Sequence, residues 1–357
     1  MSYELNKKLR ELIPYEPICG DYKIRLDANE SFIEPDDELV GKIQAAVRDV
    51  SFNRYPDPYA TGAIKAFAEL YNVDSDNVVA GNGSDELISI ILSAFLEKGN
   101  KVVTLSPDFS MYGFYAEIYE NVVLNVNKND DLSVDVDFLI DNINKISPKA
   151  IIFSNPCNPT SLGISKPDII KLVSSVDCLV ILDEAYMDFW DQSMLGDYSK
   201  FDNLIILKTV SKAIGFAAIR LGFAVSNTKI IGAIKAVKSP YNVNSLTQAV
   251  AEVVLADKEK IKENINNIIR SKNELYENLK LIESKHNNKI KVYNSKTNFV
   301  FMKAKDANAV FEALKKRSIV VRCMGEFIRV TAGSKEENTA FLNEFEKILK
   351  SEVSLEN

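Results

Sequence analysis

Short apolar runs alternate with helical patterns from about residue 60 to residue 240, and this alternation constrains the fold more than any other feature of the sequence. Several runs are apolar almost without interruption, which is typical of strands covered by helices on both faces. The sequence therefore predicts an α/β protein with a mostly parallel, doubly wound sheet. The expected strands are residues 77–80, 101–105, 122–126, 150–154, 178–182, 204–208 and 222–225.

A second region begins after the turn at residues 239–242, which contains a Ser-Pro pair. A long helix is expected at 258–284, followed by strands at 297–302, 319–322 and 326–331 and helices at 307–316 and from 336. This pattern indicates a smaller α+β domain, and a chain of 357 residues is long enough for about two domains. We expect an N-terminal arm at 1–25, a large domain at 26–240 and a small C-terminal domain at 241–357.

The composition excludes several classes of function. The net charge of -7 argues against nucleic acid as a partner, and no apolar run approaches the ~18 residues of a membrane span. The charged N-terminus lacks a signal peptide, and the four scattered cysteines indicate free thiols, so a cytoplasmic location is expected. The single histidine, His286, cannot build a clustered zinc site, and no metal is expected.

Four polar motifs each follow an expected strand, where ligands bind in sheets of this kind. They are residues 81–86 (GNGSDE), 155–160 (NPCNPT), 183–186 (DEAY) and Ser211-Lys212 with Arg220. The first opens a helix, whose backbone N–H groups can bind an anion, although its own acidic residues would oppose a phosphate unless cations come from elsewhere. Asp183 ends a buried strand, where a carboxylate is costly unless it meets a cation or a donor. Each motif alone is a weak signal, since tight turns and helix caps use the same residues.

In this order, the motifs resemble the fold type I pyridoxal-phosphate (PLP) aminotransferases, and most closely the histidinol-phosphate branch of that family. The resemblance covers nearly the whole chain. It also includes residues 26–30 (LDANE), 53–56 (NRYP), 107–109 (PDF), 209–212 (TVSK), 220–223 (RLGF), Arg322 and 329–333 (RVTAG). The ordered set is far more specific than any one of its members.

The resemblance implies a role for each residue of a PLP site. Lys212 would bond covalently to the cofactor and later move a proton at the substrate. Asp183 would keep the ring nitrogen protonated. Asn158 and Tyr186 would donate hydrogen bonds to the ring's phenolate oxygen, and Phe109 would stack on the ring.

The resemblance also implies how the cofactor phosphate is bound. The backbone around Gly83, Ser84 and Asp85 would hold it together with Ser211 and Arg220. The guanidinium of Arg220 would supply the cation that the acidic helix start requires.

For the substrate, the resemblance implies that Arg322, Arg329 and Tyr15 clamp a phosphate and that Asn29 lies at the same site. Tyr55 would reach the cofactor phosphate of a second subunit, so a homodimer is expected. Arg322, Tyr15, Asn29 and Tyr55 also have ordinary structural or surface roles open to them.

The preferred function is transamination between histidinol phosphate and 2-oxoglutarate, giving imidazole acetol phosphate and glutamate. An aromatic amino-acid aminotransferase and a threonine-phosphate decarboxylase are alternatives. A nicotinamide-dependent oxidoreductase lacks support because the third glycine of its fingerprint is absent. A transcription regulator built on the same scaffold would normally carry an additional basic DNA-binding domain, which the sequence pattern does not predict. Two departures from the family pattern stand out: Ser161 replaces a glycine, so that turn is expected to differ, and residues 31–35 lack the usual Pro-Gly pair.

Overall fold

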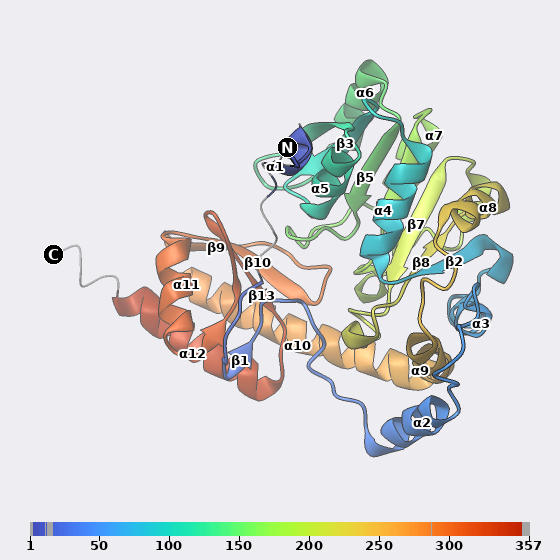
Figure 1. Cartoon of the computed structure of the whole chain (residues 1–357). Coiled ribbons are helices and arrows are strands. Elements are labelled where there is room, and N and C mark those ends of the chain that lie inside the picture. The colour runs from blue at the N-terminus through green and yellow to red at the C-terminus, as the bar shows by residue number, and fades with distance from the viewer. Residues whose placement is uncertain (1–2, 11, 13–16, 287, 352–357) are drawn as a thin grey trace.

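The computed structural model describes residues 3–10, 12, 17–286 and 288–351 of the chain. A large part with a central sheet and a smaller part with its own sheet are joined by the long helix α10 (Lys258–Lys285), as Figure 1 shows. Among the described residues, no helix combines the length and apolar character needed to cross a membrane.

The large part is built on a seven-stranded sheet with the order β2-β8-β7-β6-β5-β3-β4. All seven expected strands are confirmed to within one residue at each end, and β8 runs antiparallel to the other six. The strands are β2 (Val78–Gly81), β3 (Lys101–Ser106), β4 (Val122–Asn127), β5 (Ala150–Ser154), β6 (Leu179–Asp183), β7 (Leu204–Thr209) and β8 (Gly222–Val225).

Alternate residues of these strands enter two different hydrophobic cores. In β6, Val180 and Leu182 face one core and Ile181 faces the other, as the period of two in a strand requires. The first core takes in α3 (Thr61–Tyr71), α6 (Val136–Ile146), α7 (Lys166–Ser174) and α9 (Ser245–Ala256); the second takes in α4 (Ser84–Phe95), α5 (Met111–Ile118) and α8 (Thr228–Val237). Both faces are therefore covered, which confirms the doubly wound α/β class. Each fully buried aliphatic side chain contributes about 1.5–3 kcal/mol to this packing.

The smaller part has an antiparallel sheet with the order β12-β13-β10-β9, packed against helices. Its elements are β9 (Ile290–Val292), β10 (Phe299–Ala304), α11 (Ala307–Lys315), β12 (Arg322–Met324), β13 (Phe327–Thr331) and α12 (Lys335–Ser351). This part corresponds to the expected α+β region, with β9 as an additional short strand.

The single strand expected at residues 319–322 is wrong, because the chain there forms two. β11 (Ile319–Val320) pairs in parallel with β1 (Ile24–Arg25), whereas β12 pairs with β13 across the turn at Gly325. The partner of β11 comes from the N-terminal segment, almost 300 residues earlier, so local sequence patterns could not reveal the division.

Helix α10 connects the two cores directly. Ile261 near its start is buried in the first core, and Leu275 and Leu279 lie in the core of the smaller part. Helix α9, which follows residue 240, packs against α3 and α2 (Asp37–Arg48). We propose the domain division 1–25, 26–240 and 241–357. Helix α9 belongs to the last of these ranges by sequence, but its apolar face packs in the core of the large domain.

Candidate active site

A cavity of about 560 Å³ opens where the carboxyl ends of β3, β5, β6 and β7 meet the smaller part. Its volume is in the range of small-molecule sites. It is lined by most of the residues that the sequence singled out, namely Asn29, Ser84, Asp85, Phe109, Asn158, Asp183, Tyr186, Ser211, Lys212, Arg220, Arg322 and Arg329. The structure therefore brings together residues that are up to 300 positions apart.

Asp183 is the last residue of β6 and is 5% exposed. Tyr112 donates a hydrogen bond to its Oδ2 at 2.7 Å, and the backbone N–H of Ala185 donates to Oδ1 at 2.9 Å. Burial nevertheless raises the pKa of Asp183 to about 6. A cationic N–H group placed in the cavity beside this carboxylate would offset the cost of its burial.

Lys212 lies three residues beyond the end of β7, and its Nζ donates to the carbonyl oxygen of Ala28 at 2.9 Å. Burial, followed by the nearby charge of Arg329, lowers its pKa to about 8. About a tenth of the amine is therefore neutral at pH 7, far more than for an ordinary lysine, and a nucleophile or a proton acceptor must be neutral.

The start of helix α4 and Arg220 form an anion cradle. Gly83 precedes the helix with φ 88°, and a Cβ atom at this glycine would lie 2.9 Å from Arg220 Nη2. Arg220 Nη1 lies 3.5 Å from Ser211 Oγ, and Nη2 lies 3.7 Å from Asp85 Oδ2. Backbone N–H groups, a hydroxyl and a guanidinium thus face one small space, which suits a phosphate dianion.

Two hydrogen-bond donors point into the cavity between Asp183 and the anion cradle. Asn29 donates to the Tyr186 hydroxyl at 2.8 Å, and burial raises the pKa of Tyr186 to about 12, so the phenol keeps its own hydrogen for another acceptor. The side-chain oxygen of Asn158 accepts from Arg329 Nη1 at 2.5 Å, which leaves its NH₂ group as a donor. These two donors suit an anionic oxygen.

Two arginines stand side by side at the far end of the cavity. Arg322 of β12 is paired directly opposite Arg329 of β13, so the two guanidiniums start from neighbouring positions of one sheet. Arg329 also donates to the carbonyl oxygen of Asp27 at 2.6 Å. This end of the cavity is suited to a dianion or a carboxylate.

Tyr55, one of the expected site residues, does not line the cavity of its own chain. Tyr55 is 81% exposed and stacks on Tyr241, with ring centroids 4.6 Å apart. Tyr15 lies outside the described residues. The position of Tyr55 leaves the expectation open, because Tyr55 was expected to act in a second subunit.

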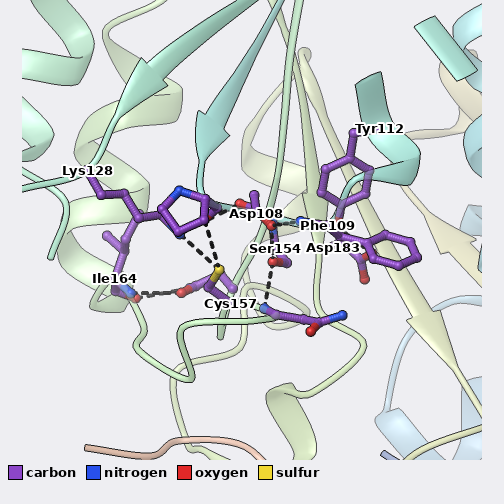
Figure 2. Close-up of polar contacts among 11 residues, drawn as sticks. Asp108, Phe109, Tyr112, Lys128, Ser154, Cys157, Ile164 and Asp183 are labelled. Atoms are coloured by element: carbon purple, nitrogen blue, oxygen red, sulfur yellow. Dashed lines mark hydrogen bonds and ion pairs between the residues drawn. The ribbon is translucent and has the colours of Figure 1, made fainter. Parts of the chain in front are cut away.

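Three residues of the site were missed by the sequence analysis. Tyr112, which bonds to Asp183, lies three residues after Phe109, and their rings meet edge to face at 5.4 Å (Figure 2). Helical spacing could have indicated Tyr112, because residues three apart share a helix face. Asp108 and Asp27 also line the cavity; both lie in segments that carry the resemblance, 107–109 and 26–30, but neither was assigned a role there.

No group of three or more His, Cys, Asp or Glu side chains suitable for a metal ion occurs in the parts of the chain that the structure covers. The cavity presents instead a lysine amine, a buried carboxylate, an anion cradle and a pair of arginines. This combination defines a class of protein that binds a phosphorylated, ring-containing cofactor next to an anionic substrate.

Comparison with known proteins identifies the class. The family model for aminotransferases of class I and II matches residues 21–345, and the chain belongs to this family.

Several individual relatives within this family are named for one specific activity. The chain is similar to the histidinol-phosphate aminotransferase of Clostridium novyi, with 44% identity over 96% of this chain and 97% of that protein. The enzyme of the same name from Clostridium kluyveri is 41% identical over 96% of this chain and 98% of that protein. The solved histidinol-phosphate aminotransferase of Sinorhizobium meliloti has the same fold, with a TM-score of 0.86, 22% identity and coverage of 97% of this chain and 98% of that one.

Proposed function

We propose that this protein is a PLP-dependent aminotransferase that transfers the amino group of histidinol phosphate to 2-oxoglutarate. The observation that carries the proposal is the placing of Lys212 and Asp183 in one cavity with two paired arginines. The curated relatives at 36–44% identity that bear this activity in their names support the choice of substrate.

The residues of the cavity fit PLP at each of its polar groups. Asp183 would pair with the ring nitrogen, which is the cation that its buried carboxylate needs. Tyr186 and Asn158 would donate to the phenolate oxygen, and Phe109 would cover one face of the ring. The phosphate would occupy the cradle of Gly83, Ser84, Asp85, Ser211 and Arg220, where the φ of 88° at Gly83 favours glycine and a Cβ atom would lie 2.9 Å from Arg220 Nη2. When bound, PLP supplies an aldehyde that reacts with amines and a ring that accepts the electron pair released at the substrate Cα.

Lys212 would hold the cofactor and then serve as the group that takes and returns the proton at the substrate Cα. Its lowered pKa of about 8 favours this exchange at neutral pH. Arg329 lowers that pKa and also bonds to Asn158, so the arginine links the substrate end of the cavity to the cofactor end.

The substrate phosphate would bind between Arg322 and Arg329, with Tyr15 and Asn29 completing the site. 2-Oxoglutarate would place a carboxylate on the same arginines in the second half of the reaction. Both substrates would present an anionic group to the two arginines, so the same pair of guanidiniums would bind each substrate in turn.

A homodimer completes the proposal. Tyr55 is an exposed aromatic ring, as are Phe52 and Tyr59 close to it in the sequence, and we propose that Tyr55 reaches the cofactor phosphate of a second subunit. A location in the cytoplasm is also proposed, in keeping with free cysteines and small-molecule substrates.

One experiment tests the proposed substrate against its alternatives. Steady-state assays would offer histidinol phosphate, phenylalanine and threonine phosphate to the PLP-loaded protein, each with 2-oxoglutarate. Glutamate should form fastest with histidinol phosphate. A preference for phenylalanine would indicate an aromatic aminotransferase, and release of CO₂ from threonine phosphate would indicate a decarboxylase. Either result would overturn the choice of substrate while leaving the PLP site intact.

A further inference from the structure

A buried lysine and a buried cysteine lie next to each other beneath the cavity and have no role in the proposed function. Lys128 follows β4 at the edge of the sheet, and Cys157 lies in the turn after β5. Lys128 Nζ is 2.9 Å from Cys157 Sγ and donates to the carbonyl oxygen of Pro107 at 2.8 Å (Figure 2). The side chain of Lys128 crosses the end of β3 to make these contacts.

The side chains of the pair are buried, and a buried carboxylate lies next to them. The side chains of Lys128 and Asp108 are each 2% exposed, and Cys157 is 4% exposed. Asp108 Oδ2 lies 3.9 Å from Lys128 Nζ, farther than the sulfur does. The carbonyl oxygen of Pro107 at 2.8 Å is the nearest of these partners to the ammonium, and the sulfur, which is a weak acceptor, lies at 2.9 Å.

The distance between the two atoms is short for this pair of elements. It lies within the ~2.7–3.2 Å range of N–H···O hydrogen bonds, although sulfur is a larger atom than oxygen. The nitrogen and the sulfur are therefore already at a separation that a single bridging atom can span, and no backbone movement is needed to join them.

We propose that Lys128 and Cys157 form an oxidation-dependent covalent bridge in which one oxygen atom joins Nζ to Sγ. A first molecule of hydrogen peroxide oxidises the thiol to a sulfenic acid and leaves as water. A second molecule of peroxide accepts two electrons as the sulfenic oxygen bonds to Nζ. The hydrogen of the sulfenic acid and one hydrogen of the neutral amine leave in two further water molecules. The sum is one thiol, one amine and two peroxides giving one N–O–S link and three waters.

The protonation of the cluster changes as the sulfur is oxidised. Burial, followed by the charge of Asp108, raises the pKa of the Cys157 thiol overall, and the ammonium of Lys128 offsets only part of this rise. Burial lowers the pKa of Lys128, but Cys157 and Asp108 outweigh it and raise the pKa overall. Once the sulfur is a neutral sulfenic acid, Lys128 loses one of these two counter-charges and becomes a better nucleophile.

The pair lies close to the cavity, although neither Lys128 nor Cys157 lines the cavity itself. Asn158, which directly follows Cys157, lines the cavity together with Asp108 and Ser154. Ser154 Oγ donates to Asp108 and accepts from the backbone N–H of Asn158, so the pair lies directly behind the cavity wall. Cys178 provides a matched control, because it is 6% exposed and contacts no lysine amine in the described part of the chain.

Mass spectrometry of the PLP-loaded protein tests the proposal. A background with Cys19→Ser and Cys323→Ser removes the two less buried thiols. After exposure to hydrogen peroxide under native conditions, the protein should gain about 14 Da, from one oxygen gained and two hydrogens lost, and a thiol reductant should reverse the change. Peptide mapping should find residues 128 and 157 in one cross-linked peptide pair.

Two variants make the result specific. Cys157→Ser keeps the Lys128–Asp108 ion pair and should abolish the gain of about 14 Da, whereas Cys178→Ser should leave it unchanged. The proposal is overturned if Cys157 gains about 16 or 32 Da without a link to Lys128, as expected for sulfenic or sulfinic acid. It is equally overturned if both residues stay unmodified while peroxide oxidises Cys178.

Discussion

Replacement of Asp183 with Asn should make the protein without cofactor more stable at neutral pH, although it should destroy the cofactor site. The pKa of Asp183 is raised from 3.8 to about 6 by burial. The folded protein therefore favours the protonated acid, and the stability that this provides is lost as the pH rises from about 4 through about 6. A difference of about 2 pKa units corresponds to about 3 kcal/mol. The amide of the variant would carry no charge at any pH and would keep an acceptor for Tyr112.

Urea denaturation of the two cofactor-free proteins, at equal protein concentration, measures the difference. At about pH 8 the variant should be more stable by about 2–3 kcal/mol, and near pH 4 the advantage should disappear. Addition of PLP should reverse the order, because only the carboxylate of the wild type can pair with the ring nitrogen. The absorption of the bound cofactor reports this binding independently of activity.

Asp197→Asn is a matched control of opposite sign. Lys166 and Lys200 lower the pKa of Asp197 below its ordinary value, so its charged form favours the folded state. This variant should lose stability above about pH 4 and gain none at any pH. If Asp183→Asn were less stable than the wild type by the same amount at every pH, burial would not destabilise the charged form of Asp183. The argument for a cationic partner would then fail.

Further substitutions test the remaining parts of the site. Lys212→Ala should abolish turnover while leaving the circular dichroism spectrum unchanged, since the role of the amine is chemical. Arg322→Ala should raise the KM for histidinol phosphate about 10-fold or more, because a hydrogen bond to a charged group is worth about 1.5–3 kcal/mol; an unchanged KM would contradict the phosphate clamp. Gly83→Ala should weaken PLP binding in fluorescence titrations, because the added Cβ would lie 2.9 Å from Arg220 Nη2; unaltered affinity would place the phosphate elsewhere. Tyr55→Phe should weaken PLP binding only in the dimer, as titrations across the dimer dissociation range would reveal.

The large sheet was predictable because its signals are local. Most of the strands are short apolar runs with both faces buried, so the pattern survives in the sequence alone; the edge strand β4 is the most exposed of the seven. The same holds for Asp183 and Lys212, which are found at the ends of such runs. Their meeting in one cavity follows from the parallel arrangement, since the carboxyl ends of parallel strands lie at one edge of the sheet.

Features that depend on distant partners were not predictable. The pairing of β1 with β11, and the contact of Lys128 with Cys157, join segments that no local pattern relates. Ser161 is a further case. Its turn was expected to differ from one with glycine, yet Ser161 adopts φ 62°, in the left-handed region that glycine favours, and its hydroxyl bonds to the carbonyl oxygen of Asn294 at 2.7 Å. That tertiary contact helps to stabilise the unusual backbone angle.

The central claim is that one amine, that of Lys212, carries the cofactor. Reduction of the PLP-loaded protein with borohydride, followed by digestion and mass spectrometry, tests this most directly. The peptide containing Lys212 should carry a reduced pyridoxyl group, and the Lys212→Ala variant should carry none. A pyridoxyl group on a different lysine, or its absence from the wild-type protein, would contradict the account of the site.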